Sequence, residues 1–184
     1  MAPTRGARLF LASNFSGELT DEDLQYTGGL YLTKKIDSDL PIHIKLGVGY
    51  QTYLGKPKWL PEFSFSQKIN ENLAYEIGLP QTEIRYTLDY KNAFTATASQ
   101  NGMYSNISSP LVLSGNASAE KAELSVTTLG LGYEYALDEN WSFSLTGGYL
   151  LNNKFNLLND TENKVYEFDM PSRPFFSTGI KFNL

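Results

Sequence analysis

The chain has 184 residues, a length that suits a single domain, and 41% of them are hydrophobic and 14% aromatic. Its formal net charge of −5 argues against nucleic acid as a partner, because a basic surface is the usual footprint of nucleic-acid binding. The absence of cysteine excludes disulfides and cysteine-based metal sites. No apolar run approaches the roughly 18 residues that a membrane-spanning helix needs.

The N-terminal region carries little pattern. No apolar segment of a signal peptide follows residues 1–5, so we expect that, if the protein is exported, its signal has been removed from this sequence or the sequence is a fragment. Residues 1–8 are expected to be unstructured, and residues 8–14 form a poorly alternating first strand. Residues 14–23 are a polar loop with an acidic cluster, which we interpret as a solvated surface loop. The alternative is a Ca²⁺ site, since Ca²⁺ prefers oxygen ligands.

Alternating side chains then predict strands, because successive residues of a strand point to opposite faces. The clearest case is residues 42–54, where the isoleucines, Leu46, Val48 and Tyr50 oppose His43, Lys45 and glycines. Similar patterns predict strands over residues 24–35, 59–68, 73–79, 84–88, 93–100, 124–137, 141–151 and 174–184. With residues 8–14 this gives about ten strands, and their lengths match the tilted strands that cross a bilayer.

Two kinds of connection alternate along the chain. Residues 36–40, 69–72, 88–92 and 137–140 are short turns of similar composition. The other set contains the long connections 15–23, 101–117 and 152–173, and residues 164–168 extend a strand into the last of these. Short periplasmic turns and longer outer loops are typical of outer-membrane barrels.

These observations favour a closed, antiparallel, up-and-down transmembrane β-barrel of about ten strands, within a range of about 8–12. The apolar face would contact lipid, with an aromatic girdle and apolar strand residues at Tyr50, Trp59, Tyr75, Tyr86, Tyr133, Trp141, Tyr149, Phe176 and Phe182. The opposite face would form a polar, ion-paired lumen containing His43, Lys45, Glu62, Glu76, Glu83, Arg85, Glu134 and Lys181. A soluble lipocalin-like barrel with an apolar ligand is the alternative, since its strands also alternate.

The closing strand is the most regular amphipathic segment near the C-terminus. It presents Phe176, Ile180, Phe182 and Leu184 on one face, as the last strands of outer-membrane barrels tend to do. We expect this strand to be recognised by the barrel-assembly machinery and to pair with the first strand.

Residues 26–184 resemble an uncharacterised family of outer-membrane β-barrels of the Bacteroidota type, catalogued as a domain of unknown function. The segments that carry the resemblance are residues 28–36 (GGLYLTKKI), 46–50 (LGVGY), 55–57 (GKP) followed by Leu60-Pro61, 69–73 (INENL), Leu79-Pro80, 84–88 (IRYTL) and the closing strand. The resemblance implies a Gram-negative outer-membrane location and a longer parent protein, with strands before residue 9 that this sequence lacks. It brings no substrate or catalytic residue.

The residues themselves predict no catalytic, metal or cofactor site. His43 is the only histidine, and no serine stands in a recognisable nucleophile context, so an outer-membrane lipid hydrolase is the weaker alternative. We therefore expect a structural or interaction barrel with a side-chain-filled lumen, embedded in outer-membrane lipid and meeting its surroundings through the long loops. A small porin-like passive pore for small solutes is the other alternative.

Overall fold

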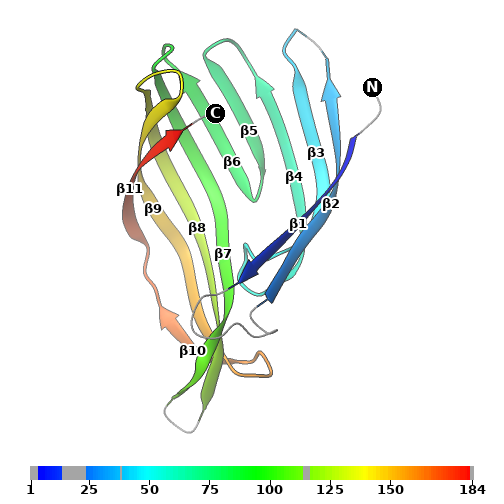
Figure 1. Ribbon diagram of the computed structural model, residues 1–184, viewed down its shortest axis with the longest axis vertical. Helices are drawn as coiled ribbons and strands as arrows, with labels where there is room; N and C mark the ends of the chain where they lie inside the picture. Colours follow the sequence, from blue (N-terminus) through cyan, green and yellow to red (C-terminus); the bar gives the residue numbers. More distant parts are fainter. Residues whose placement is uncertain (1–3, 14–23, 38, 114–116, 183–184) are drawn as a thin grey trace.

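The structure is a computed structural model, and it describes residues 4–13, 24–37, 39–113 and 117–182. These residues form one antiparallel sheet of 11 strands without a helix (Figure 1). The strands are β1 (Thr4–Ser13), β2 (Leu24–Ile36), β3 (Ile42–Gln51), β4 (Lys58–Lys68), β5 (Leu73–Leu79), β6 (Gln81–Thr87), β7 (Asn92–Val112), β8 (Ser118–Ala136), β9 (Trp141–Leu158), β10 (Lys164–Asp169) and β11 (Arg173–Phe182). No helix long and apolar enough to cross a membrane occurs among the described residues.

From β1 to β10, neighbours in sequence are neighbours in the sheet, so the predicted all-β, up-and-down order is confirmed. The last two strands share one position, because β11 pairs with the first half of β9 and β10 pairs with its second half. The two are separated by residues 170–172, which include Pro171. The sheet therefore has ten strand positions, with a broken strand at the last of them.

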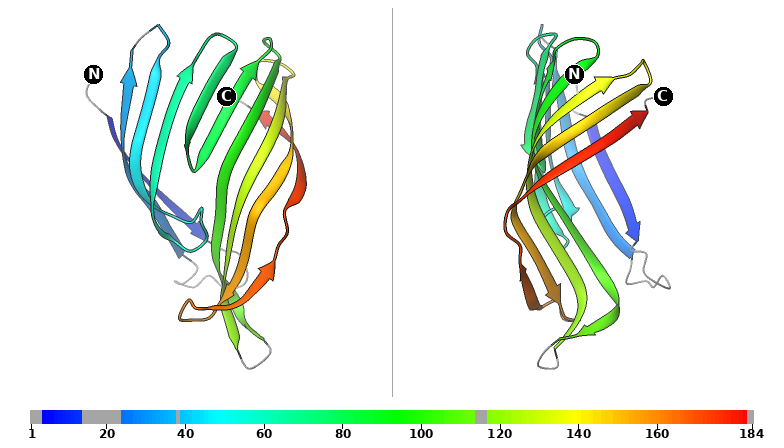
Figure 2. Two further views of the ribbon diagram at one scale, coloured as in Figure 1. Left: turned by 180° about the vertical axis from the view of Figure 1, so that it is seen from behind. Right: turned by 90° about the vertical axis from the view of Figure 1, so that its left-hand side faces the viewer.

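The sheet curves and twists strongly but does not close (Figure 2). Among the described residues β1 pairs only with β2, and β10 and β11 pair only with β9, so the predicted closed barrel is present as an open curved sheet. The expected pairing of the first and last strands is absent. The first strand has little alternation, and alternation is what specifies a register with a new neighbour.

Three segments that we expected to lack regular structure are strands, and those predictions were wrong. Residues 4–8 belong to β1, where Thr4 lies opposite Thr33. Most of residues 101–117 belongs to β7 and β8, and residues 152–158 extend β9. The second segment is rich in Asn, Ser and Gly and the third is rich in Asn, all of which have weak strand propensity, but backbone pairing with a neighbouring strand overrides it.

The hairpin of β5 and β6 is much shorter than its neighbours. A cis peptide bond between Leu79 and Pro80 joins the two strands, about halfway along the sheet (Figure 1). The strand predicted over residues 73–79 ends at Leu79, immediately before Pro80. As a result β4 and β7 run on past the end of the hairpin without a strand between them.

Three tight turns share one hydrogen-bonding pattern. The Oδ1 atoms of Asn70, Asp89 and Asp138 each accept bonds from the backbone N–H groups two and three residues later, at 2.8–2.9 Å. Such Asx turns offer the backbone a local partner where the strand ladder ends. The predicted turn at residues 36–40 contains Ser38, which lies outside the described residues.

Candidate functional site

The strand register separates the predicted residues into two faces. Cross-strand pairs such as Gly47 with Glu62 and Glu76 with Glu83 place the polar set on one face of the sheet. Pairs such as Tyr50 with Trp59 place the aromatic set on the other face. All eight residues expected in the lumen and all nine expected toward lipid follow this division.

Two ion pairs lie on the polar face. Lys45 Nζ lies 3.3 Å from Glu62 Oε2, and Gln51 donates a 2.8 Å hydrogen bond to the other carboxylate oxygen of Glu62. Arg85 Nη1 lies 2.9 Å from Glu134 Oε2. The second pair spans β7, because Arg85 is on β6 and Glu134 is on β8, with buried Ala93 on the strand between them. Four of the eight polar residues are thus brought together in pairs.

The other four polar residues are not brought into such pairs. His43, Glu76 and Glu83 have no ion pair or side-chain hydrogen bond within the described part of the chain, and together with Arg85 they line a cavity of about 610 Å³. Lys181 acts on Glu134 only through its charge. Glu76 lies directly opposite Glu83, an arrangement of like charges that destabilises a strand pair.

The apolar face is exposed. Leu30, Leu131, Phe176 and Ile180 are 67–71% exposed. By contrast, the buried apolar residues of the described chain are few: Leu60, Leu157, Leu158, Tyr104 and three alanines. The sheet therefore has a continuous apolar surface instead of a large hydrophobic core.

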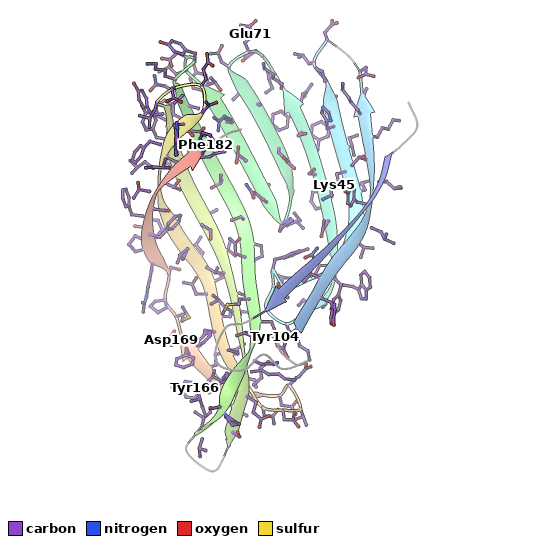
Figure 3. All side chains as sticks on the ribbon, in the orientation of Figure 1. Lys45, Glu71, Tyr104, Tyr166, Asp169 and Phe182 are labelled. Carbon is purple, nitrogen blue, oxygen red and sulfur yellow. The ribbon has the colours of Figure 1, made fainter. Side chains whose placement is uncertain are left out.

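Aromatic pairs occupy both ends of this apolar face. Near the tight turns, Trp141 and Phe182 have ring centroids 4.7 Å apart, and Tyr50 and Trp59, at the other end, are 5.7 Å apart. The pair of Phe155 and Phe168, with ring centroids 4.9 Å apart, was not predicted from the sequence. The alternation in residues 164–168 indicated the strand that carries Phe168. Figure 3 shows Phe182 and Tyr166 near opposite ends of the molecule.

The sequence analysis also missed a polar cluster far from the tight turns, which we call the Lys56 cluster. The backbone N–H of Lys56 donates to Glu123 Oε2 at 3.1 Å, and its side chain forms an ion pair with Glu162. Tyr104 Oη donates to Glu162 at 2.9 Å. Lys121 Nζ lies 3.7 Å from Glu162, and Asn156 donates to Glu123 at 2.7 Å. These residues lie up to 106 positions apart in sequence, from Lys56 to Glu162, so no local pattern could reveal the cluster.

Hydrogen bonds control the charge of Glu162, which lies in the turn between β9 and β10. Bonds from Lys56 and then from Tyr104 hold the pKa of this carboxyl below its ordinary value of 4.5. The carboxylate is therefore the form that the Lys56 cluster stabilises.

No group of three or more His, Cys, Asp or Glu side chains within the described ranges could hold a metal ion. The acidic cluster in residues 14–23, considered above for Ca²⁺, lies outside these ranges, as does Leu184.

The chain matches a protein-family model over most of its length. The model of a family described as a domain of unknown function (DUF6268) matches residues 6–183. No curated protein and no solved structure matches the chain. The resemblance inferred from the sequence motifs is confirmed at the level of an uncharacterised domain family.

Proposed function

The chain belongs to the DUF6268 domain family, and we propose that it is an outer-membrane β-barrel protein of structural or interaction type, with a lumen filled by polar side chains. The observation that supports this most is the exposed apolar face of the sheet. Monomeric soluble proteins rarely expose a contiguous apolar patch larger than a few hundred Å². Lipid is the solvent in which such a face is stable.

The polar face supports a filled lumen in preference to an open channel. The pairs of Lys45 with Glu62 and Arg85 with Glu134 neutralise four charges that would otherwise be costly away from water. A barrel of about ten strands is narrow enough for side chains to fill much of its interior.

The proposed barrel requires β1 to pair with the strand formed by β10 and β11. Lipid contains no water to satisfy the free N–H and C=O groups of a strand edge, so a sheet in a bilayer is stable when closed. The extended β7–β8 hairpin, which projects beyond the other strands in Figure 1, is the part we propose meets extracellular partners.

Fluorescence quenching by brominated lipids tests the membrane proposal. The two tryptophans, Trp59 and Trp141, lie on the apolar face near opposite ends of the strands. In vesicles, bromine near the headgroups should quench both strongly, and bromine at the bilayer centre should quench both less. Single Trp59→Phe and Trp141→Phe variants separate the two signals. A protein that stays monomeric without detergent and shows no quenching would contradict the proposal and favour the soluble, ligand-binding alternative.

A small passive pore is the second candidate, favoured by the cavities on the polar face. One has a volume of about 610 Å³, and another, of about 250 Å³, is lined by residues that include Lys45, Tyr53 and Glu62. Connected across a closed barrel, these spaces would conduct small ions. Steady single-channel steps in planar bilayers support the pore, and their absence from correctly folded protein supports the filled lumen.

A further inference from the structure

The short β5–β6 hairpin leaves a break in the hydrogen-bonded wall. The last pair of β4 with β5 is Phe63 with Leu79, so among the described residues, residues 58–62 of β4 have no strand neighbour on that side. The last pair of β6 with β7 is Gln81 with Ser99, so residues 100–103 of β7 have no strand neighbour on that side within the described ranges either. Pro61, which has no backbone N–H, lies in the unpaired part of β4, as expected for proline at a strand edge.

The turn between β3 and β4, residues 52–57, lies in this break. A Cβ atom added to Gly102 of β7 would overlap the carbonyl oxygen of Thr52 and lie 2.8 Å from the nitrogen of Gly55. The turn also supplies a partner to the unpaired edge, since Tyr53 Oη donates a 2.8 Å bond to the carbonyl oxygen of Pro61. The turn therefore takes the place of the missing strands against both edges.

The far side of the turn is held by the Lys56 cluster. Lys56 binds two carboxylates, Glu123 through its backbone and Glu162 through its side chain, and the two belong to different parts of the β8–β9–β10 region. Glu162 also contacts Tyr104 and Lys121. An attachment through charged groups is one that protonation, salt or a competing ion can weaken.

The break joins two different environments. On one side is the exposed apolar face of β4, which carries Trp59 and Phe63. On the other is the cavity of about 250 Å³ that Pro80, at the tip of the short hairpin, lines together with Lys45, Gln51, Tyr53 and Glu62. Gln51 and Tyr53 already donate to Glu62 and Pro61, which leaves the Gln51 amide oxygen and the Tyr53 hydroxyl oxygen as acceptors facing this cavity. Lys45 and Glu62 add a charge of each sign.

We propose that residues 52–57 are a latch over a lateral opening between β4 and β7, through which an amphipathic lipid exchanges between the bilayer and this cavity. The lipid would place its small polar head against Gln51 and Tyr53 and leave its hydrocarbon chain toward the apolar face. Release of Lys56 from Glu162 opens the latch. The proposal rests on the membrane location argued above.

Thiol labelling tests the latch, because the chain contains no native cysteine. Leu60→Cys is the reporter, since Leu60 is only 8% exposed and lies in the unpaired part of β4. In vesicles, a maleimide carried on a lipid chain should label this cysteine slowly. Adding Lys56→Met or Glu162→Gln should raise the rate about tenfold or more, as expected for loss of hydrogen bonds between charged groups.

Matched controls separate release of the latch from general loosening. Lys56→Arg keeps the ion pair and should stay within about twofold of the parent rate. Lys164→Met breaks the exposed ion pair of Lys164 with Glu167 on β10 and should have no effect. Folding of each variant is checked by heat-modifiable gel mobility, and Thr52→Cys serves as a second reporter if Leu60→Cys does not fold.

Unchanged labelling in both latch variants would overturn the proposal, as would an equal increase in Lys164→Met. Labelling by a water-soluble maleimide but not by the lipid-borne one would also overturn it, because the opening would then lead to water. Tryptophan quenching by brominated lipids in the same vesicles reports on membrane insertion separately. Failure of the membrane proposal is thereby distinguished from failure of the latch.

Discussion

At the scale of single residues, the polar face depends on interactions that reach across a strand. Arg85 extends over β7 to Glu134, and the strand beneath has the small residue Ala93 at the point of crossing. Ala93 is only 5% exposed, as expected for a small residue beneath an ion pair that crosses its strand. The pairing links β6 to β8 across β7.

Arg85→Met should therefore lower the free energy of unfolding by roughly 1 kcal/mol, the upper end of the range for partly exposed ion pairs. Urea unfolding of the detergent-folded protein measures the change. A double-mutant cycle with Glu134→Gln isolates the pair, and a coupling energy below about 0.3 kcal/mol would show that the two charges act independently.

Gly147 and Gly148 form a matched pair on β9. A Cβ atom on Gly148 would overlap the Leu129 carbonyl oxygen and lie 2.8 Å from Gly130 Cα, whereas one on Gly147 meets only the Phe175 oxygen at 3.9 Å. The close approach of β8 and β9 thus requires glycine at position 148 and not at position 147.

Gly148→Ala should lower stability by roughly 1–3 kcal/mol, because the strands must separate to accept the methyl group. Gly147→Ala should stay within about 0.5 kcal/mol of the parent, as for most surface substitutions. Equal effects of the two substitutions in urea unfolding would contradict the observed packing of β8 against β9.

At the scale of elements, the tight turns are defined by a single side-chain oxygen each. Asp138 accepts bonds from the N–H groups of Asn140 and Trp141, both at 2.8 Å. Trp141 begins β9 and stacks on Phe182, so the turn also sets the position of an aromatic pair. The similar composition of the turns has a common cause, because each needs an Asn or Asp at the same place.

Asp138→Ala should cost about 1 kcal/mol of stability, the usual effect of removing a side-chain acceptor from free backbone N–H groups. Asp138→Asn should restore most of the loss, since Asn70 performs the same task in the turn before β5. Glu139→Ala is the control within the same turn. The prediction fails if the Asp138 and Glu139 substitutions are equally mild.

The turn between β9 and β10 should respond to pH through Glu162. Its pKa is lowered in the folded protein by Lys56 and Tyr104, with Lys121 also nearby. A lowered pKa gives stabilisation that is fully present above the ordinary value of 4.5 and is lost as the pH falls through the folded value. Labelling of the Leu60→Cys reporter should therefore accelerate below about pH 4.5. Glu162→Gln should abolish this pH dependence, and an unchanged acid response in that variant would assign it to another group.

At the scale of the whole molecule, the sheet has two unpaired edges. Ten strand positions in up-and-down order bring the first and last strands into antiparallel orientation if the sheet closes. Unpaired edges template association with other chains in water and are unfavourable in lipid. Closure is therefore the change we expect between the open sheet and the protein in a bilayer.

Cysteine pairs placed along β1 and β11 test closure. Antiparallel pairing predicts that intramolecular disulfides form only between positions whose residue numbers have a constant sum, because paired Cα atoms lie within about 5.5 Å. Non-reducing gels of the protein in vesicles reveal these pairs. Disulfides that are only intermolecular, or that follow no constant sum, would contradict a closed barrel.

Much of the fold follows from local sequence. Period-two alternation is set by strand geometry, so it identified most strands and assigned Lys45, Arg85 and Trp141 to faces that agree with the register. The short turns were also predicted, and Asn70, Asp89 and Asp138 explain three of them, because such residues give the backbone a local hydrogen-bond acceptor. The strands of residues 4–8, 101–112 and 152–158 were not predicted, because pairing with a neighbouring strand holds them extended and their own residues show no clear strand pattern.

Only the tertiary structure decided which charges meet. Glu62 and Glu83 are alike in the sequence, yet Glu62 has Lys45 and Gln51 within reach and Glu83 faces Glu76. Lys56 reaches Glu162 because the short hairpin allows the β3–β4 turn to approach β7. Alternation is a property of one strand, whereas these contacts depend on the lengths of strands that lie between distant segments. The sequence by itself therefore determined the two faces of the sheet, and the packing determined the latch.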